Sequence, residues 1–189
     1  MPDDECFDIN GSILIMLESK TIRLRLACVD DAEFILSLRI SEKYNKYLSS
    51  VEDDVELQKS WLKEYKNRES IGLEYYFIIE RKDNGFPIGT VRLYDFKESE
   101  NSFSWGSWIL NENKTRTAAV ESAMLVYQFA FEVKKFSRSH FEVRRENKAV
   151  LAFHEKLGAI KTDENDTDIY YHYYPEAYQK QKVSLERYL

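Results

Sequence analysis

The sequence of 189 residues is poor in several residue types that mark particular classes of protein. Its two cysteines, Cys6 and Cys28, match neither a multi-disulfide framework nor the spacing of a zinc site. With three prolines and six glycines, it contains no segment that resembles a linker between domains. Apolar runs such as Ile13–Leu17 are far shorter than the roughly 20 residues that a membrane-spanning helix needs. The sequence therefore argues against a disulfide-rich, zinc-binding or membrane-spanning protein.

Positive charge is also in short supply. The 27 basic and 33 acidic residues give a formal net charge of −6, which argues against a protein dedicated to nucleic acid. Three of the first six residues are acidic, and the N-terminal segment lacks the basic start and long apolar segment of a signal peptide. Together with the scarcity of cysteine, this predicts a cytoplasmic, reduced protein with no nucleic-acid partner and no membrane span.

Apolar and aromatic residues, in contrast, are plentiful. They make up 43% and 14% of the chain, respectively, which excludes a disordered or low-complexity protein. A chain of this length is the size of one domain with a sizeable core. We therefore predict a single domain over residues 1–189, in which residues 1–18 form an N-terminal extension of uncertain order.

The pattern of apolar residues predicts the secondary structure of the first half. Residues 21–27 alternate between apolar and basic side chains, as in a half-buried strand. Asp30 and Asp31 then stand where the N-terminus of a helix is expected, and a second amphipathic helix is predicted from about Asp53 to Asn67. Three further strands are predicted to form an antiparallel meander, with bounds Glu74–Arg81, Pro87–Phe96 and Phe103–Leu110.

The second half alternates between helices and strands. The predicted elements are a loop over Asn111–Arg116, a helix over Thr117–Lys134, a strand over His140–Arg144, a helix from Asn147 to Gly158, a strand over Ile169–Tyr174 and a polar C-terminal helix. A long helix between two strands implies one parallel crossover. The fold class is therefore α/β (α+β), with a mixed, mostly antiparallel central sheet flanked by helices.

The loop before the long helix has the features of an anion site. A helix N-terminus offers unpaired N–H groups and partial positive charge, and Lys114 and Arg116 add two cations. The loop lacks the glycines of a P-loop or of a dinucleotide-binding fingerprint. It is therefore either a phosphate-binding loop of another kind or an ordinary capped helix with solvated cations.

A second segment resembles a known family. Residues 147–159 combine Asn147, the apolar-aromatic residues before His154, and Glu-Lys-Leu-Gly followed by an apolar residue. This pattern is similar to that of the Gcn5-related N-acetyltransferase (GNAT) superfamily, and the order of elements resembles that fold from about Thr21 to Tyr174. The resemblance implies a single-domain GNAT-like fold whose sheet is splayed at an acetyl-CoA cleft, between the strands Phe103–Leu110 and His140–Arg144.

The same resemblance implies acetyl-CoA as co-substrate and no metal. The pantetheine would lie along the end of one strand and the pyrophosphate at the loop; the implied cofactor-binding residues are Trp108, Ile109, Leu110, Lys114, Thr115, Arg116, Thr117, Ala118, Ala119 and Asn147. Thr117 stands where the family has a glycine, so either the loop takes another shape, with hydroxyls and amides on the phosphates, or CoA binds more weakly. Asn147 either caps its helix, holds the pantetheine, or does both.

The implied chemistry is direct transfer of an acetyl group to a primary amine in a ternary complex. His154 takes the place of a family tyrosine that protonates the CoA sulfur, although a histidine beside Phe153 and Leu157 is also typical of plain packing. Asp95, or less favourably Glu80, is the candidate acceptor of the amine proton; the alternative for each is a solvated surface carboxylate. The histidines and acidic residues have no metal-ligand spacing.

The partner predicted from the resemblance is a small-molecule amine. The candidate substrate-binding residues are Tyr94, Trp105, Tyr44 and Asn45. The aromatic tract is similar to that of acetyltransferases for nucleotide-linked amino sugars of surface polysaccharides, and also to ribosomal-protein N-terminal acetyltransferases. A protein N-terminus or a polyamine is therefore the alternative acceptor, and a non-catalytic acyl-CoA-binding domain is the alternative from another class. An exposed sheet edge and the aromatic last strand would allow a homodimer.

Overall fold

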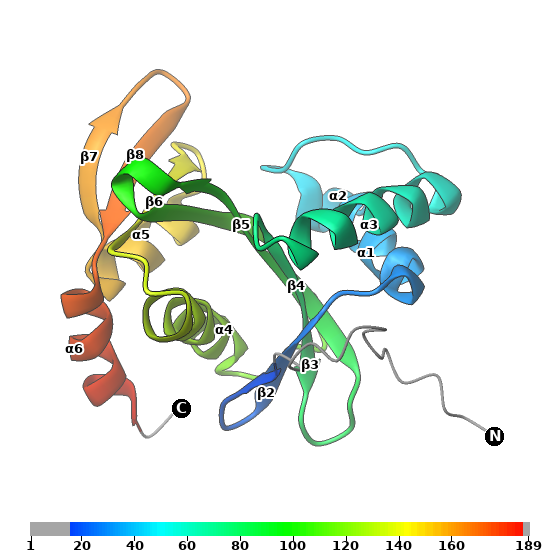
Figure 1. Ribbon diagram of the computed structural model, residues 1–189, viewed down its shortest axis with the longest axis horizontal. Coiled ribbons are helices and arrows are strands. Elements are labelled where there is room, and N and C mark those ends of the chain that lie inside the picture. The colour runs from blue at the N-terminus through cyan, green and yellow to red at the C-terminus, as the bar shows by residue number, and fades with distance from the viewer. Residues whose placement is uncertain (1–15, 187–189) are drawn as a thin grey trace.

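The computed structural model describes residues 16–186, which form one mixed eight-stranded sheet with helices on both faces (Figure 1). The strands lie in the order β1-β2-β3-β4-β5-β6-β8-β7. Their bounds are β1 Met16–Glu18, β2 Ile22–Leu26, β3 Tyr75–Arg81, β4 Pro87–Lys97, β5 Ser102–Leu110, β6 Arg138–Arg144, β7 Ile160–Glu164 and β8 Asp168–Tyr173. Of the predicted extension 1–18, residues 1–15 lie outside the described residues, and the last three form β1.

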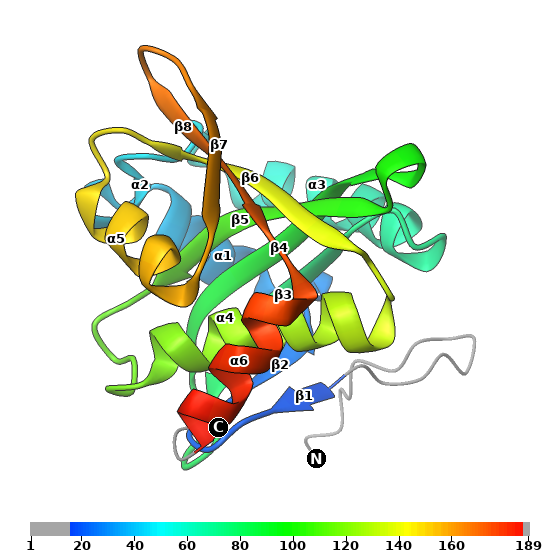
Figure 2. The same cartoon turned by 90° about the vertical axis from the view of Figure 1, so that its left-hand side faces the viewer.

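The helices form two layers. Their bounds are α1 Ala32–Arg39, α2 Glu42–Asn45, α3 Val55–Ser70, α4 Ala118–Gln128, α5 Lys148–Leu157 and α6 Pro175–Leu185. The first three cover one face of the sheet, and the last three cover the other (Figures 1 and 2). Short 3-10 turns precede α1 and follow β4, and a π-helical segment extends α4 through residues 129–133.

Alternation along β3 explains why the sheet has two cores. Tyr76 and Ile78 pack with Ile35, Leu62 and Tyr65 under α1 and α3. The alternate residues of β3 (Tyr75, Phe77 and Ile79) belong to the larger core beneath α4 to α6, together with their neighbours on β4 and β5. Because successive side chains of a strand point to opposite faces, a continuous apolar run such as this one is typical of a strand buried on both sides.

The predicted splaying of the sheet is confirmed between β5 and β6. These parallel strands pair only at Ser102 with Arg138 and at Phe103 with Ser139, although both strands continue for several residues. Beyond Phe103 they diverge, which leaves main-chain groups of β5 without a strand partner on that side. A bulge bends β5 at the same place, where Ser107 has a φ of 47°.

Three elements were not predicted from the sequence: β1, the short helix α2 and β7. Strand β7 is exposed along its whole length, so it carries no alternating apolar pattern. The helix predicted over Thr117–Lys134 is present as α4 and its π-helical continuation. Tyr171 and Tyr173 of the aromatic strand are buried, as plain sheet packing requires.

Candidate active site

A cavity of about 380 Å³ lies where β5 and β6 separate. We call it the cleft cavity; it is lined by Tyr47, Leu48, Ser49, Tyr94, Trp105, Gly106, Ser107, Trp108, Phe141, Glu142, Val143, Arg144, Asn147, Val150, His154 and Asp168. It therefore brings together the end of β5, the middle of β6 and the first turns of α5, as the sequence predicted for the acetyl-CoA cleft. Among the predicted site residues, Tyr94, Trp105, Trp108, Asn147 and His154 line it.

The bulge in β5 is fixed by hydrogen bonds from the neighbouring strand β4 and from helix α4. Thr90 Oγ1 donates to the carbonyl of Ser107 at 2.9 Å, and Trp108 Nε1 donates to Ser122 Oγ of α4 at 3.0 Å. The indole of Trp105 is 5% exposed and donates to Tyr127 OH at 3.2 Å. Trp105 thus packs mainly in the core and offers only one edge to the cleft cavity.

His154 is 4% exposed and lies among aromatic rings, with its ring centroid 4.5 Å from that of Phe141 and 5.4 Å from that of Trp105. Its Nδ1 is buried without a hydrogen-bond partner. Burial lowers the pKa of His154 from 6.5 to about 4, because the imidazolium loses its hydration there. The ring is therefore neutral near pH 7, so it can donate a hydrogen bond from a ring N–H to negative charge in the cleft, but it holds no imidazolium proton to transfer.

The carboxylates that line the cleft cavity are Glu142 and Asp168, not Asp95, and Asp168 is paired with Arg144 at 3.1 Å. Asp95 does not line the cleft cavity; it sits on a bulge of β4 with a φ of 50°, where its Oδ2 lies 2.9 Å from His140 Nε2. His140 Nδ1 in turn lies 2.9 Å from the buried Ser102 Oγ. Glu142 follows His140 by two residues on β6, so alternation along the strand places both on one face of the sheet. Glu142 lines the cleft cavity, whereas His140 does not.

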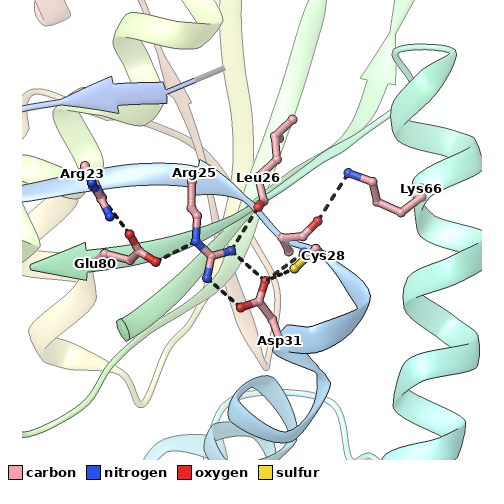
Figure 3. A network of polar contacts seen from close by, with 8 residues as sticks. Arg23, Arg25, Leu26, Cys28, Asp31, Lys66 and Glu80 are labelled. Atoms are coloured by element: carbon pink, nitrogen blue, oxygen red, sulfur yellow. Dashed lines mark hydrogen bonds and ion pairs between the residues drawn. The ribbon is translucent and has the colours of Figure 1, made fainter. Parts of the chain in front are cut away.

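Glu80, the second carboxylate considered from the sequence, belongs to a structural ion-pair network (Figure 3). It is 5% exposed and accepts hydrogen bonds from Arg23 Nε at 2.7 Å and Arg25 Nε at 2.6 Å. Arg25 also makes a two-point contact with Asp31, which precedes α1. The network joins β2 and β3 to the start of α1, so Glu80 has a role in the fold.

The predicted phosphate loop is anchored by a buried carboxylate that the sequence analysis did not single out. Glu121 of α4 is fully buried and accepts from the hydroxyl and the amide of Thr21, and from the hydroxyls of Ser19 and Thr117. Burial acts to raise the pKa of Glu121, but the hydrogen bonds outweigh it and hold that pKa below its ordinary value. The carboxylate is therefore charged, and it ties the loop to the turn between β1 and β2.

This anchoring decides which loop groups face outward. Thr117 donates its hydroxyl hydrogen to Glu121, and Thr21 does the same, so Thr115 Oγ1, 2.7 Å from Thr21 Oγ1, is the donor of that pair. Both loop hydroxyls, those of Thr115 and Thr117, therefore donate their hydrogen bonds toward the protein interior. In the described part of the chain, the amides of Ala119 and Val120 have no acceptor, and Ala118 N–H bonds only to Thr115 O, at 3.3 Å.

The remaining residues implied to bind the cofactor lie in the loop, at the end of β5 and at the start of α5. Lys114 and Arg116 are exposed, and neither has a carboxylate partner among the described residues. Asn147 begins α5, but its side chain makes no capping hydrogen bond, so it is available to the cleft cavity that it lines. Ile109 and Leu110 are the last residues of β5, where they lead into the loop.

Two predicted substrate residues lie outside the cleft cavity. Tyr44 OH donates to the carboxylate of Glu112 and accepts from Glu112 N–H at 3.3 Å, so it links α2 to the loop. Asn45 ends α2, and it is the following turn, with Tyr47 and Ser49, that reaches the cleft. The predicted substrate-binding roles of Tyr44 and Asn45 therefore stay predictions, and neither residue lines the cleft cavity.

The described residues contain no cluster of three or more side chains that could hold a metal ion, and no helix in that range is long and apolar enough to cross a membrane. Against known families, residues 21–160 match the model of the acetyltransferase (GNAT) domain. The chain belongs to the GNAT family. It is an N-acetyltransferase, and the predicted fold class is confirmed.

Solved structures agree with this assignment of the GNAT enzyme. One, described as apo FdhC, a nucleotide-linked sugar GNAT, is 50% identical, covers 94% of this chain and 99% of its own, and has a TM-score of 0.88. A ribosomal-protein-S5-alanine acetyltransferase from Vibrio fischeri (16% identity, 85% and 96% covered, TM-score 0.74) and a spermidine N-acetyltransferase chimera from Vibrio cholerae and hSSAT (18%, 85% and 99%, 0.70) share the fold. No curated protein matches the chain by sequence.

Proposed function

We propose that this enzyme transfers an acetyl group from acetyl-CoA to the primary amine of a nucleotide-linked amino sugar. The observation that carries the proposal is the 50% identity, over nearly the full length of both chains, to a protein described as a nucleotide-linked sugar GNAT. The polar composition of the cleft supports it, since Tyr94, Ser107 and Glu142 can bind a hydroxylated ring. The acetyltransferases for ribosomal protein and spermidine support the fold alone, because their identity is below 20%.

The residues present fit acetyl-CoA. The diverging edge of β5 leaves main-chain groups that an extended pantetheine can pair with, as an added strand would. The unpaired amides at the start of α4, with Lys114 and Arg116, suit a pyrophosphate. Since Thr115 and Thr117 donate inward, we assign phosphate binding to these amides and cations, without hydroxyl donors.

The reaction needs one proton acceptor and one donor. The amine nitrogen attacks the thioester carbonyl; the C–N bond forms, the C–S bond breaks, and the amine loses a proton while the thiolate gains one. Glu142 is the carboxylate placed to accept the amine proton, and Asp95 with His140 is the alternative just beyond the cleft. His154, neutral at rest, donates a hydrogen bond from a ring N–H that stabilises the developing charge on the leaving sulfur, and the thiolate takes up its proton from solvent, to which Glu142 returns the proton of the amine.

The first test is calorimetric titration with acetyl-CoA, using the wild type and the double variant Lys114→Ala/Arg116→Ala. We expect micromolar binding that the double variant weakens at least tenfold. The double variant Lys59→Ala/Lys63→Ala on α3 removes the same charge away from the loop and should leave the affinity unchanged. Equal loss in both double variants would contradict the assignment of the phosphate loop.

The second test is turnover with a panel of nucleotide-linked amino sugars, peptides with free N-termini and polyamines. The proposal expects kcat/KM to be highest for a member of the first class. Preference for a peptide or a polyamine would replace the proposed acceptor. Tight acetyl-CoA binding without turnover of any amine would favour the non-catalytic alternative.

A further inference from the structure

A second, smaller cavity of about 200 Å³ adjoins the cleft cavity on the acceptor face. The two share Ser49 and Ser107 in their linings. Its floor is formed by Tyr76 of β3 and Arg92 of β4, which are cross-strand partners, and by Ser107 at the bulge of β5. Arg39 of α1 is part of its wall. We call it the side cavity; its volume is several times the roughly 30 Å³ of one water molecule.

The side cavity carries positive charge. Arg39 and Arg92 line it, and no carboxylate does so among the described residues. Arg92 is held in place by Glu74, which does not line the cavity, and by stacking over Trp61 at 5.2 Å from the ring centroid. Glu74 also forms an ion pair with Arg68, so one carboxylate is shared by two guanidinium groups. Arg39 has no carboxylate partner in the described part of the chain.

Two buried donors in this cavity lack partners. Tyr76 is 2% exposed, and its hydroxyl has no hydrogen bond. Arg39 Nε is likewise buried without a partner, whereas its Nη2 donates to the backbone and the side chain of Ser49, both at 3.0 Å. Buried polar atoms are nearly always satisfied in folded proteins, so two orphan donors beside one cavity indicate a missing acceptor. An anionic oxygen satisfies both donors and the local charge.

We propose that the side cavity binds a phosphate group of the acceptor, through Arg39 and Tyr76. The inference rests on the proposed function, because a nucleotide-linked sugar carries its diphosphate next to the sugar. Phosphate bound here, beside the bulge at Ser107, holds the sugar over the cleft cavity and leaves the loop before α4 to acetyl-CoA. Arg39 and Tyr76 are then residues that position the acceptor, and they take no part in proton transfer.

The test uses Tyr76→Phe, which removes only the hydroxyl, and Arg39→Gln. We expect the KM for the nucleotide-linked amino sugar to rise about tenfold in Tyr76→Phe and more in Arg39→Gln, with kcat within about twofold of wild type. The Kd for acetyl-CoA should be unchanged. Arg23→Gln, whose partner Glu80 keeps Arg25, is the control and should match the wild type in all three quantities.

Direct binding separates this proposal from the proposed function. Wild-type protein should bind inorganic pyrophosphate in the presence of saturating CoA, and both variants should bind it at least tenfold more weakly. If no nucleotide-linked sugar is acetylated but this binding is present and lost in the variants, the function fails and the anion site stands.

Other outcomes overturn the site itself. An unchanged KM in Tyr76→Phe and Arg39→Gln, with both variants folded by circular dichroism, refutes it. So does a change confined to the KM for the acyl-CoA, because the anion would then belong to the acyl donor. Absence of pyrophosphate binding to the wild type at millimolar concentration also refutes it.

Discussion

The buried imidazole of His154 makes the stability of this protein depend on pH in a measurable way. Its folded-state pKa is lowered to about 4 from 6.5, so the unfolded chain binds a proton that the folded chain excludes. The contribution of His154 to stability is therefore full above pH 6.5 and is lost progressively as the pH falls toward 4. The full contribution of His154 to the free energy of unfolding is about 3 kcal/mol, and about 2 kcal/mol of this contribution is lost by pH 5.

The substitution His154→Phe removes this titration and keeps an aromatic ring among Phe141 and Trp105. Urea unfolding of both proteins at pH 8 and pH 5 gives four free energies of unfolding. We expect the wild type to lose about 2 kcal/mol more than the variant between these pH values. His172→Phe is the control: the pKa of His172 is also lowered by burial, but the ring is only half-buried, so its effect should be smaller.

Catalysis gives a second readout for the same variant. If His154 donates to the leaving sulfur, His154→Phe should lower kcat with little change in the Kd for acetyl-CoA. Parallel losses of stability in wild type and variant would refute the burial argument. An unchanged kcat would leave the burial argument intact and remove His154 from the chemistry.

Three further predictions concern the loop and the cleft. Glu121→Gln should destabilise the fold by about 2 kcal/mol and raise the Kd for acetyl-CoA, because an amide N–H₂ would face hydroxyl donors; unchanged urea unfolding would contradict this. Glu142→Gln should lower kcat by about 10²-fold or more, whereas Asp95→Asn should lower it less than tenfold; the reverse order would make Asp95 the base. Trp108→Phe should cost about 1 kcal/mol of stability for the lost hydrogen bond to Ser122, measured by urea unfolding; no loss would mean that this bond contributes nothing.

Local patterns were enough to predict the elements that bury apolar side chains. The alternation at residues 21–27 and the runs through Tyr76 and Trp105 became β2 to β5, because each strand packs against helices on at least one face. Strand β7 was missed for the opposite reason: its residues are exposed, and it is held by backbone pairing to β8. Pairing of that kind leaves no apolar period in the sequence.

The site could be predicted only where one segment carries it. Asn147 and His154 line the cleft cavity, and they could be proposed from the sequence because the helix that they belong to has a recognisable pattern. The positions of Glu142 and Arg39 in the cavity linings could not be predicted, because they depend on the divergence of β5 and β6 and on the packing of α1, both of which are long-range features. Asp95 was preferred for its position at the end of a strand, yet the bulge there directs it to His140. The alternation of His140 and Glu142 along β6 was the available signal.

The carboxylate of Glu121 couples two parts of the molecule that are far apart in the sequence. Ser19 and Thr21 bind the same carboxylate as Thr117. The turn after β1 and the predicted phosphate loop are therefore held in one arrangement before a ligand binds. A loop that is already ordered loses little conformational entropy when it binds a ligand, whereas a more flexible glycine-rich loop would lose more. The coupling works in both directions. A ligand at the loop should therefore slow amide hydrogen exchange in the β1–β2 hairpin, and loosening that hairpin should weaken the ligand.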